Sequence, residues 1–425
     1  MAAKDGLGLA LSGASPHAAG LYQEALDAYH RYAGEPFPKL RAAVADSPDF
    51  VMAHVLIAYM TLVGTNTRLR SFAESSIAAA ADRPATDREL GHVAAVQALQ
   101  AGEVRKAGRI LEDVALDEPR DLLALQAGQL TDFLTGDARM LRDRIARARP
   151  AWSADMPNYH AILGMHAFGL EETGHYARAE AAGREAIALQ PRNGWAQHAV
   201  AHVLEMQDRR ADGVAWMRAD PDAWSRESFF AIHNWWHTAL FHLGTGETDE
   251  VLALYDGPIR GERSGMGFDL VDAAALLWRL HLLGVDVGGR WDELADAFAA
   301  EPRGLSAFED VHAMMAFVAA GREAEAAETL RAMAVAVTGA GDNAEVTRDI
   351  GLPVARALQA FGRGRHAKAC DLLRDVRNGA ARFGGSHAQR DVLDLTLIAA
   401  AERAGEVSLA RALAAERDAA RPVIA

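Results

Sequence analysis

Two histidine pairs are the residues of this 425-residue chain whose spacing is most suggestive of chemistry. His198 and His202 lie in GWAQHAVAHVLEMQ, and His233 and His237 lie in SFFAIHNWWHTALFHL. Residues four apart are one turn apart on a helix, so both imidazoles of a pair reach one point. Together with Glu205 the pairs supply three or four ligands. Nitrogen and oxygen ligands suit Zn²⁺, Fe²⁺ or Mn²⁺ at an open, catalytic-type site.

The spacing alone is weak evidence for a metal, because neither pair lies in an HExxH string with its own general base. A solvated helix face is the more common place for the first pair and Glu205. Ordinary packing against a neighbouring helix explains the second pair equally well. Phe230 and Phe241, which alternate with the second pair, favour a pocket lining, since ligand sites are mostly apolar with a few polar groups.

A third polar group opens a helix expected in GGSHAQRDVLDLTL. Ser386 is a good N-cap for this helix. Asp391 follows His387 by four residues and is expected to accept the imidazole N–H, which would fix the tautomer. Arg390 would bind a carboxylate or a developing oxyanion. A capped surface helix with acidic residues near its N-terminus is the plainer explanation of this segment by itself.

The elements that must position these residues are helices arranged in repeats. Alanine-rich stretches such as AEAAGREAIAL carry apolar residues three and four apart, which is typical of helices. Glycine and small residues recur at fixed offsets before a proline, as expected where two helices cross closely, turn at glycine and end at proline. The members of this ladder are Ala43, Pro48, Ala95, Gly102, Ala107, Val114, Pro119, Ala167, Gly174, Ala179, Ala186, Pro191, Gly246, Val251, Gly321, Ala326, Gly405, Ala410 and Pro422.

This spacing predicts an all-α fold of the tetratricopeptide type, an α-solenoid of helical hairpins. Hairpins of this kind stack into a right-handed superhelix with a concave face. We expect one domain spanning residues 1–425. Three glycine-rich segments, near 256–268, 338–351 and 378–386, are expected to form long loops.

Composition excludes several classes of function. The net charge of −14 argues against nucleic-acid and anionic-membrane partners, which need clustered basic residues. Cys370 is the one cysteine, so neither a disulfide framework nor a cysteine-based zinc site is expected within one chain. No apolar run reaches the length of a membrane span, and the beginning of the chain is a poor signal peptide. We therefore expect a cytoplasmic protein. The GxSxG signature is missing, so no nucleophile elbow is expected. The GxGxxG and GxxxxGK[ST] signatures are also missing, so no nucleotide cofactor is expected.

Long strings of the chain resemble the tetratricopeptide repeat protein 38 family, among them the stretch at 164–206, RESFFAIHNWWHTALFHLGTGETDEVLALYD at 226–256 and GGSHAQRDVL at 384–393. The resemblance implies a tetratricopeptide-like helical fold and no particular activity. Its strings are rich in His, Trp, Asn, Arg and Asp, which helix stacking does not require. The matching positions are His198, His202, Glu205, His233, Asn234, Trp235, Trp236, His237, His387, Gln389, Arg390 and Asp391. Further matching positions are Arg88, Glu89, His92, Asp269, Asp272, Asp310 and His312.

Two hypotheses follow for function. The first is a small-molecule site inside the superhelix, built from segments 195–205, 233–237 and 387–391. Trp235 or Trp236 would wall it. The other ligand-binding candidates are Trp195, Asn234, Gln389 and Arg390. The histidines, with Glu205 and Asp391, would serve as metal ligands or as acids and bases of a hydrolase or lyase. The second hypothesis is a non-enzymatic scaffold that binds a protein or peptide on its concave face. A homodimer is compatible with either.

Overall fold

The computed structural model describes residues 3–62 and 70–421, and most of them are helical. The expected all-α class is confirmed, apart from a short antiparallel hairpin of β1 (Ala3–Lys4) and β2 (Ala10–Leu11). The chain divides into two compact units, and three helices contribute residues to both. These shared helices are α7 (Leu122–Thr135), α11 (Gly194–Met206) and α14 (Ala231–Gly244).

The first unit comprises residues 1–133, 137–203 and 219–234. Besides the hairpin and its parts of the shared helices, it contains α1 (Pro16–Arg31), α2 (Pro36–Asp46), α3 (Val51–Leu62), α4 (Arg70–Ala81), α5 (Asp87–Gln100), α6 (Val104–Asp117), α8 (Ala138–Ala148), η2 (Arg149–Ala151), α9 (Tyr159–Glu171), α10 (Tyr176–Leu189) and α13 (Pro221–Ser225).

The second unit comprises residues 134–136, 204–218 and 235–425. Its own helices are α12 (Arg210–Arg218), α15 (Thr248–Leu254), η3 (Tyr255–Ile259), α16 (Gly267–Leu282), α17 (Arg290–Ala299), α18 (Ala307–Ala319), α19 (Glu323–Ala336), α20 (Asp342–Val346), η4 (Thr347–Gly351), α21 (Leu352–Gly362), α22 (His366–Val376), η5 (Arg377–Phe383), α23 (His387–Arg403) and α24 (Val407–Ala419).

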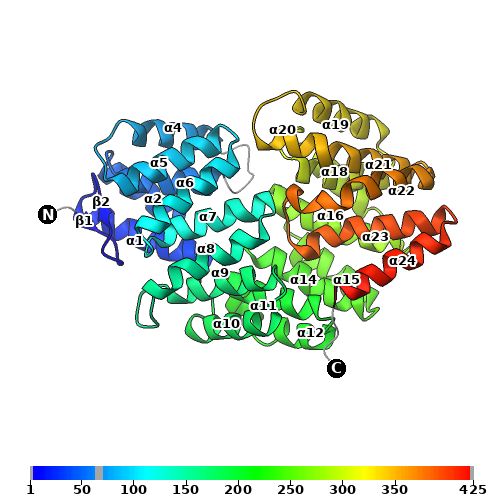
Figure 1. Ribbon diagram of the computed structural model, residues 1–425, viewed down its shortest axis with the longest axis horizontal. Coiled ribbons are helices and arrows are strands. Elements are labelled where there is room, and N and C mark those ends of the chain that lie inside the picture. Colours follow the sequence, from blue (N-terminus) through cyan, green and yellow to red (C-terminus); the bar gives the residue numbers. More distant parts are fainter. Residues whose placement is uncertain (1–2, 63–69, 422–425) are drawn as a thin grey trace. The chain divides into compact units, whose positions relative to one another are not determined.

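Within each unit, helices that follow one another in sequence pack as pairs. Figure 1 shows α9 beside α10 in the first unit and α23 beside α24 in the second, and close backbone contacts join both pairs. The turns of five pairs are made by the glycines that the ladder assigned to turns, and each adopts a left-handed φ of 69–79°. A side chain is strained in that conformation, which explains why glycine recurs there. These glycines are Gly102, Gly174, Gly246, Gly321 and Gly405.

The small residues of the ladder are buried, as the spacing predicts. Ala107, Ala179, Ala186 and Val251 are fully buried, and Ala326 is nearly so. Pro422, which closes the last ladder, lies outside the described residues. The hairpin arrangement is therefore confirmed at the level of helix pairs.

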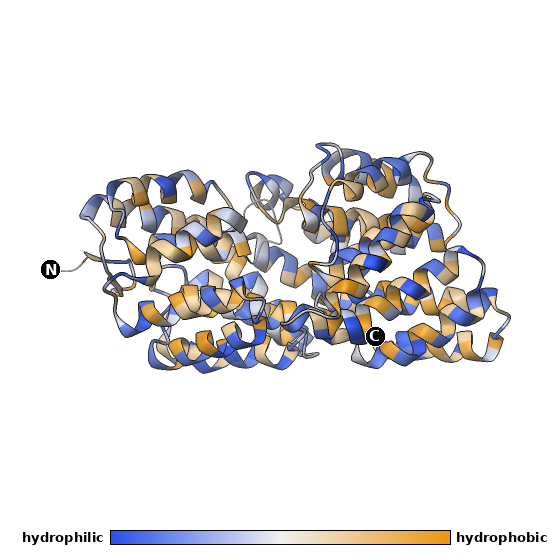
Figure 2. Cartoon of the chain, turned by 90° about the horizontal axis from the view of Figure 1, so that it is seen from above, coloured by the Kyte–Doolittle hydropathy of each residue, from blue (hydrophilic) through white to orange (hydrophobic). Residues whose placement is uncertain are grey.

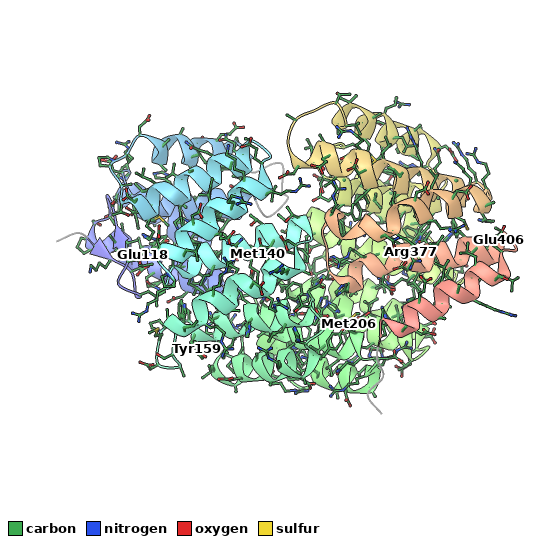
Figure 3. All side chains as sticks on the ribbon, in the orientation of Figure 1. Glu118, Met140, Tyr159, Met206, Arg377 and Glu406 are labelled. Atoms are coloured by element: carbon green, nitrogen blue, oxygen red, sulfur yellow. The ribbon has the colours of Figure 1, made fainter. Side chains whose placement is uncertain are left out.

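The three glycine-rich segments expected as long loops contain short helical turns. The first holds most of η3, the second holds α20 and η4, and the third holds most of η5. Elsewhere the connections are short and carry exposed carboxylates. Glu118 caps the end of α6 and Glu406 caps the start of α24 (Figure 3).

Hydrophobic and hydrophilic residues are interspersed along most helices (Figure 2). Where helices are covered on several sides, this pattern buries polar side chains together with the apolar core. Phe229, which precedes α14, is 46% exposed. Among the described residues, no helix has the length and apolar character needed to cross a membrane.

Candidate metal centre and polar pocket

Helix α11 is buried on both its apolar and its polar side. His198 is 2% exposed and His202 is fully buried, so a solvated face is the wrong interpretation of this helix. One reason is Gly183 of α10. A Cβ atom there would lie 2.5 Å from Val200 Cγ2, so only glycine lets the two helices approach this closely. Buried imidazoles need polar partners, because an uncompensated polar group in the core costs stability.

Three imidazoles of the first unit converge through the same ring nitrogen. His198 Nε2 lies 2.8 Å from His202 Nε2 and 3.1 Å from His233 Nε2. In a tetrahedral zinc site with Zn–N bonds of about 2.0–2.1 Å, neighbouring nitrogens are about 3.3 Å apart. Ligand atoms of the three residues all lie within 4.8 Å of one another. The predicted convergence is therefore present for these three residues, and we call them the histidine group.

Aromatic rings enclose the histidine group. The ring centroids of Phe168, Trp195 and Phe230 lie 5.4, 5.0 and 5.5 Å from that of His198. Trp195 was a ligand-binding candidate, whereas Phe168 on α9 was not singled out. An apolar wall of this kind excludes water and strengthens electrostatic interactions inside it.

A buried carboxylate stands behind one member of the group. Glu171 Oε2 of α9 lies 3.7 Å from His202 Nδ1, the ring nitrogen that faces away from His198. Both side chains are fully buried. Histidines that bind metals commonly face a carboxylate through their second nitrogen, which fixes the tautomer and raises the basicity of the first. Glu171, Glu172 and His202 also form a second group whose ligand atoms lie within 4.8 Å.

The two helices that carry the histidine group continue into the second unit with two further predicted residues. Glu205 follows His202 by three residues on α11, and His237 follows His233 by one turn on α14. Within the second unit, Glu205 Oε2 lies 3.6 Å from His237 Nδ1. His237 thus repeats the arrangement of His202, with a carboxylate beside Nδ1.

The second unit also contains a pocket of about 280 Å³. Glu205 and Asp391, both predicted site residues, line it together with Arg279, Arg417 and Arg421. Asp391 was predicted to accept a hydrogen bond from His387. In the structure Asp391 accepts hydrogen bonds from Arg417 Nε and Nη2 at 2.7 and 2.8 Å, and from Arg421 Nη2 at 2.8 Å.

Burial and the arginines act in opposite directions on the pKa of Asp391. Burial alone would raise it, but the hydrogen bond from Arg417 and the charges of Arg421 and Arg279 lower it overall. Asp391 is therefore a carboxylate that holds the arginines in place. Arg417 and Arg421 were missed because they lie outside the segments that carry the resemblance, and Arg279, on α16, was not singled out.

The start of α23 confirms the predicted cap and gives one predicted ligand residue a structural role. Ser386 caps the helix, and Gln389 completes a capping box by accepting from Ser386 N at 3.0 Å. Arg390 donates to the carbonyl of Gly385. Gln389 and Arg390 thus make hydrogen bonds at the start of their own helix. These hydrogen bonds leave their predicted role in ligand binding untested.

The remaining predicted residues of the pocket walls are distributed between the units. Asn234 donates to the carbonyl of Gly194 at 3.2 Å and so ties α14 to the start of α11 in the first unit. Trp236 is fully buried beneath the guanidinium of Arg279 in the second unit, at 5.4 Å from its ring centroid. Trp235 is half-buried.

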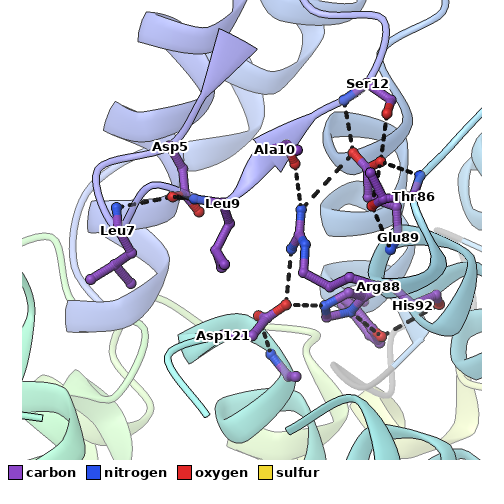
Figure 4. A network of polar contacts seen from close by, with 12 residues as sticks. Asp5, Leu7, Leu9, Ala10, Ser12, Thr86, Arg88, Glu89, His92 and Asp121 are labelled. Carbon is purple, nitrogen blue, oxygen red and sulfur yellow. Dashed lines mark hydrogen bonds and ion pairs between the residues drawn. The ribbon is translucent and has the colours of Figure 1, made fainter. Parts of the chain in front are cut away.

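Three of the further candidates belong to a network that joins the N-terminal hairpin to α5 and α7 (Figure 4). Arg88 donates to the carbonyl of Ala10 at 2.6 Å and to Asp121 at 2.9 Å, and His92 Nε2 lies 2.9 Å from the same carboxylate. Glu89 accepts from Ser12 N at 2.8 Å. Burial alone would raise the pKa of Asp121, but His92 and Arg88 hold it well below its ordinary value. The network satisfies buried polar groups and is structural.

The other candidates of the second unit are engaged locally. Asp310 accepts from Gly304 N at 3.0 and 3.1 Å, and burial raises its pKa to about 6. His312 Nδ1 donates to the carbonyl of Phe308 at 2.8 Å, and burial lowers the pKa of His312 to about 4. Asp269 accepts from Ser264 Oγ at 2.5 Å, and Asp272 is fully buried. No protein-family model matches the chain.

Proposed function

We propose that the chain binds a divalent transition metal through Nε2 of His198, His202 and His233. The supporting observation is that His198 Nε2 lies 2.8 Å from His202 Nε2 and 3.1 Å from His233 Nε2. All donors are nitrogens of neutral rings, which suits Zn²⁺. His237 is a candidate fourth ligand, because α14 presents it one turn beyond His233.

A metal accounts for the convergence better than hydrogen bonds among the rings. Nε2 of a neutral imidazole carries either one proton or one lone pair, so it can satisfy one in-plane partner. His198 Nε2 has two such neighbours. A cation accepts lone pairs from all three nitrogens at once. The carboxylate of Glu171 beside His202 Nδ1 adds the partner that metal-bound histidines commonly have.

The reaction class that this donor set supports best is metal-assisted hydrolysis or elimination on a small molecule. Such an ion supplies Lewis-acid activation and a water of lowered pKa. The chain's contribution is to fix the three rings, with Glu171 orienting His202, and to exclude bulk water with Phe168, Trp195 and Phe230. Histidine acid–base chemistry without a metal uses the same residues and is the outcome if no metal binds.

The finer predictions of fold and setting belong to the same proposal. The ladder of small residues and glycine turns supports a tetratricopeptide-like solenoid with a right-handed superhelix, related to the tetratricopeptide repeat protein 38 family. A cytoplasmic location fits the single buried Cys370. A scaffold that binds a protein or peptide on a concave face is the alternative, and a homodimer is compatible with both.

Elemental analysis of tag-free protein tests the metal. After Zn²⁺ or Co²⁺ loading and gel filtration, we expect about one equivalent in the wild type and strong loss in His198→Ala and His202→Ala. The exposed His17 offers a matched control, since His17→Ala should retain the metal. Visible absorption of the Co²⁺ form should indicate nitrogen ligands in a four-coordinate site. Occupancy below roughly a tenth of an equivalent in the wild type would exclude the proposal, because such sites bind tightly.

A further inference from the structure

The pocket of the second unit combines a buried cluster of charges with an apolar wall. Its volume of about 280 Å³ lies just below the usual range for small-molecule sites, about 300–1,000 Å³. The charged lining includes a cluster of Arg279, Arg417, Arg421, Glu205 and Asp391, and also Arg210, Asp208 and Glu402. The apolar wall includes Leu240, Leu282, Leu395 and Ile398.

The charges of this cluster do not cancel. Asp391 receives hydrogen bonds from both Arg417 and Arg421, so two guanidinium groups share one carboxylate. Glu205 lies 3.8 Å from Arg421 Nη2, an ion-pair distance but too long for a hydrogen bond. The rest of the lining adds Arg210, which pairs with Asp208, and Glu402, so over the whole pocket four arginines face four carboxylates and the imbalance is local to this cluster.

Arg279 is the arginine of this cluster that has no carboxylate partner. Its guanidinium donates to the backbone carbonyls of Ala275 and Ala388 at 2.9 and 2.6 Å, and it lies over the ring of Trp236. Among the described residues, no carboxylate lies within 4 Å of it, although the side chain is only 4% exposed. Burial lowers the pKa of Arg279, although an arginine stays protonated. A buried cation without a counter-ion is costly, so the site favours an anion.

The kind of anion follows from the charge and the wall. The one guanidinium without a carboxylate partner matches one negative charge. A phosphate ester with about two charges would be repelled by Glu205 and Asp391. Guanidinium groups bind carboxylates through paired N–H donors. The leucine and isoleucine side chains provide an apolar surface for the rest of the ligand.

We propose that this pocket binds an organic monocarboxylate with an apolar body, such as a medium-chain alkanoate. Its carboxylate would lie at Arg279 and Arg421, and its chain would lie against Leu240, Leu395 and Ile398. The site lies wholly within the second unit and does not depend on the histidine group for its charge.

Calorimetry on the full chain tests this inference with three probes: octanoate, the matched neutral octanamide and inorganic phosphate. A chelator in the buffer prevents binding of octanoate to a metal, so failure of the metal proposal would not affect the result. We expect octanoate to bind at least about tenfold more tightly than octanamide, as expected for hydrogen bonds to a charged group. Phosphate should not bind at millimolar concentration.

Substitutions locate the binding. Arg421→Ala should weaken octanoate by at least about tenfold. Arg363→Ala is the matched control in the same unit, since Arg363 pairs only with the exposed Glu323, and it should leave affinity unchanged. Ala399→Leu keeps every charge and fills part of the apolar wall, so it should weaken octanoate more than acetate. Equal binding of octanoate and octanamide, preference for phosphate, or no octanoate binding by the folded wild type would each overturn the inference.

Discussion

The histidine group of the first unit and the arginine pocket of the second accommodate buried polar side chains in opposite ways. The first gathers neutral nitrogen bases behind aromatic rings, with Glu171 beside one ring. The second gathers permanently charged groups, in which Asp391 is shared by two arginines. Neutral bases are suited to a cation and surplus guanidinium groups to an anion. The same two helices, α11 and α14, carry residues of both sites.

The difference lies in what each site requires before a ligand arrives. Neutral imidazoles can be buried together with modest electrostatic cost, because they become charged only on protonation. Arginines are charged at every relevant pH, so they need carboxylates in place when the chain folds. Acid should therefore disturb the first unit, and loss of a carboxylate should disturb the second.

Acidification should have the largest effect, and it should fall mainly on the first unit. Burial lowers the pKa of His30, His160 and His166 to about 4, from 6.5. Between pH 6.5 and pH 4 the unfolded chain therefore binds more protons than the folded chain. The free energy of unfolding is at its full value above about pH 6.5 and decreases as the pH falls towards 4. Each of these histidines should lower the free energy of unfolding at pH 4 by about 3 kcal/mol, relative to its value above pH 6.5.

The second unit should respond less to acid. There His312 has a similarly lowered pKa, but burial raises the pKa of Asp310 to about 6, which favours the folded state as the pH falls. Hydrogen exchange between pH 7 and 4.5 can follow the two units separately. Equal loss of protection in both would contradict the comparison.

Removal of Asp391 should be the next largest effect and should fall on the second unit. Asp391→Ala leaves Arg417 and Arg421 without their shared carboxylate in a largely buried place, and we expect a loss of about 3–5 kcal/mol in urea unfolding. Glu323→Ala, which breaks an exposed pair with Arg363, should cost under about 1 kcal/mol. A small effect of Asp391→Ala would show that the arginines are solvated.

Metal binding should stabilise the first unit by a comparable amount. Zn²⁺ at roughly 100–1,000 times its Kd should add about 3–4 kcal/mol to the free energy of unfolding. Hydrogen exchange should show the added protection in α9 and α11, and His198→Ala should abolish it. Arg421→Ala should leave it unchanged. Protection by Zn²⁺ that survives His198→Ala would place the metal elsewhere.

Helix caps should give the smallest effects and should be alike in the two units. Thr86 with Glu89 and Ser386 with Gln389 form capping boxes at the starts of α5 and α23. Thr86→Ala and Ser386→Ala should each cost about 1 kcal/mol in chemical unfolding. A much larger loss for Ser386→Ala would indicate that the start of α23 also shapes the arginine pocket.

The helix pairs could be predicted from the sequence because their determinants are local. Gly174 at the turn and Ala179 and Ala186 at the crossing lie within one ladder, and all three behave as the spacing predicts. The helical turns in the glycine-rich segments were not foreseen. Composition there indicates breaks, whereas tertiary contacts such as Arg382 with Glu345 and Asp349 join short helices across them.

The candidate site was predictable only where its residues share a helix. His198 and His202 meet because one helical turn separates them. Glu171 and Phe168 of α9 also contact the histidine group, and the spacing of residues along the sequence does not predict this contact. Arg417 and Arg421 were not among the predicted site residues. Their role follows from packing against α23, which sequence periodicity does not encode.

The N-terminal hairpin has a consequence for the order of events during synthesis. Its buried partners Arg88, Glu89 and Asp121 lie some 77 or more residues further along the chain. At a translation rate of about 5–20 residues per second, these partners are synthesised on the order of ten seconds after the hairpin. During that interval Ala10 and Ser12 have no native polar contacts with α5. The polar contacts of this segment with α5 therefore form later than its contacts with Gln23 and Val51, which lie nearer in the sequence.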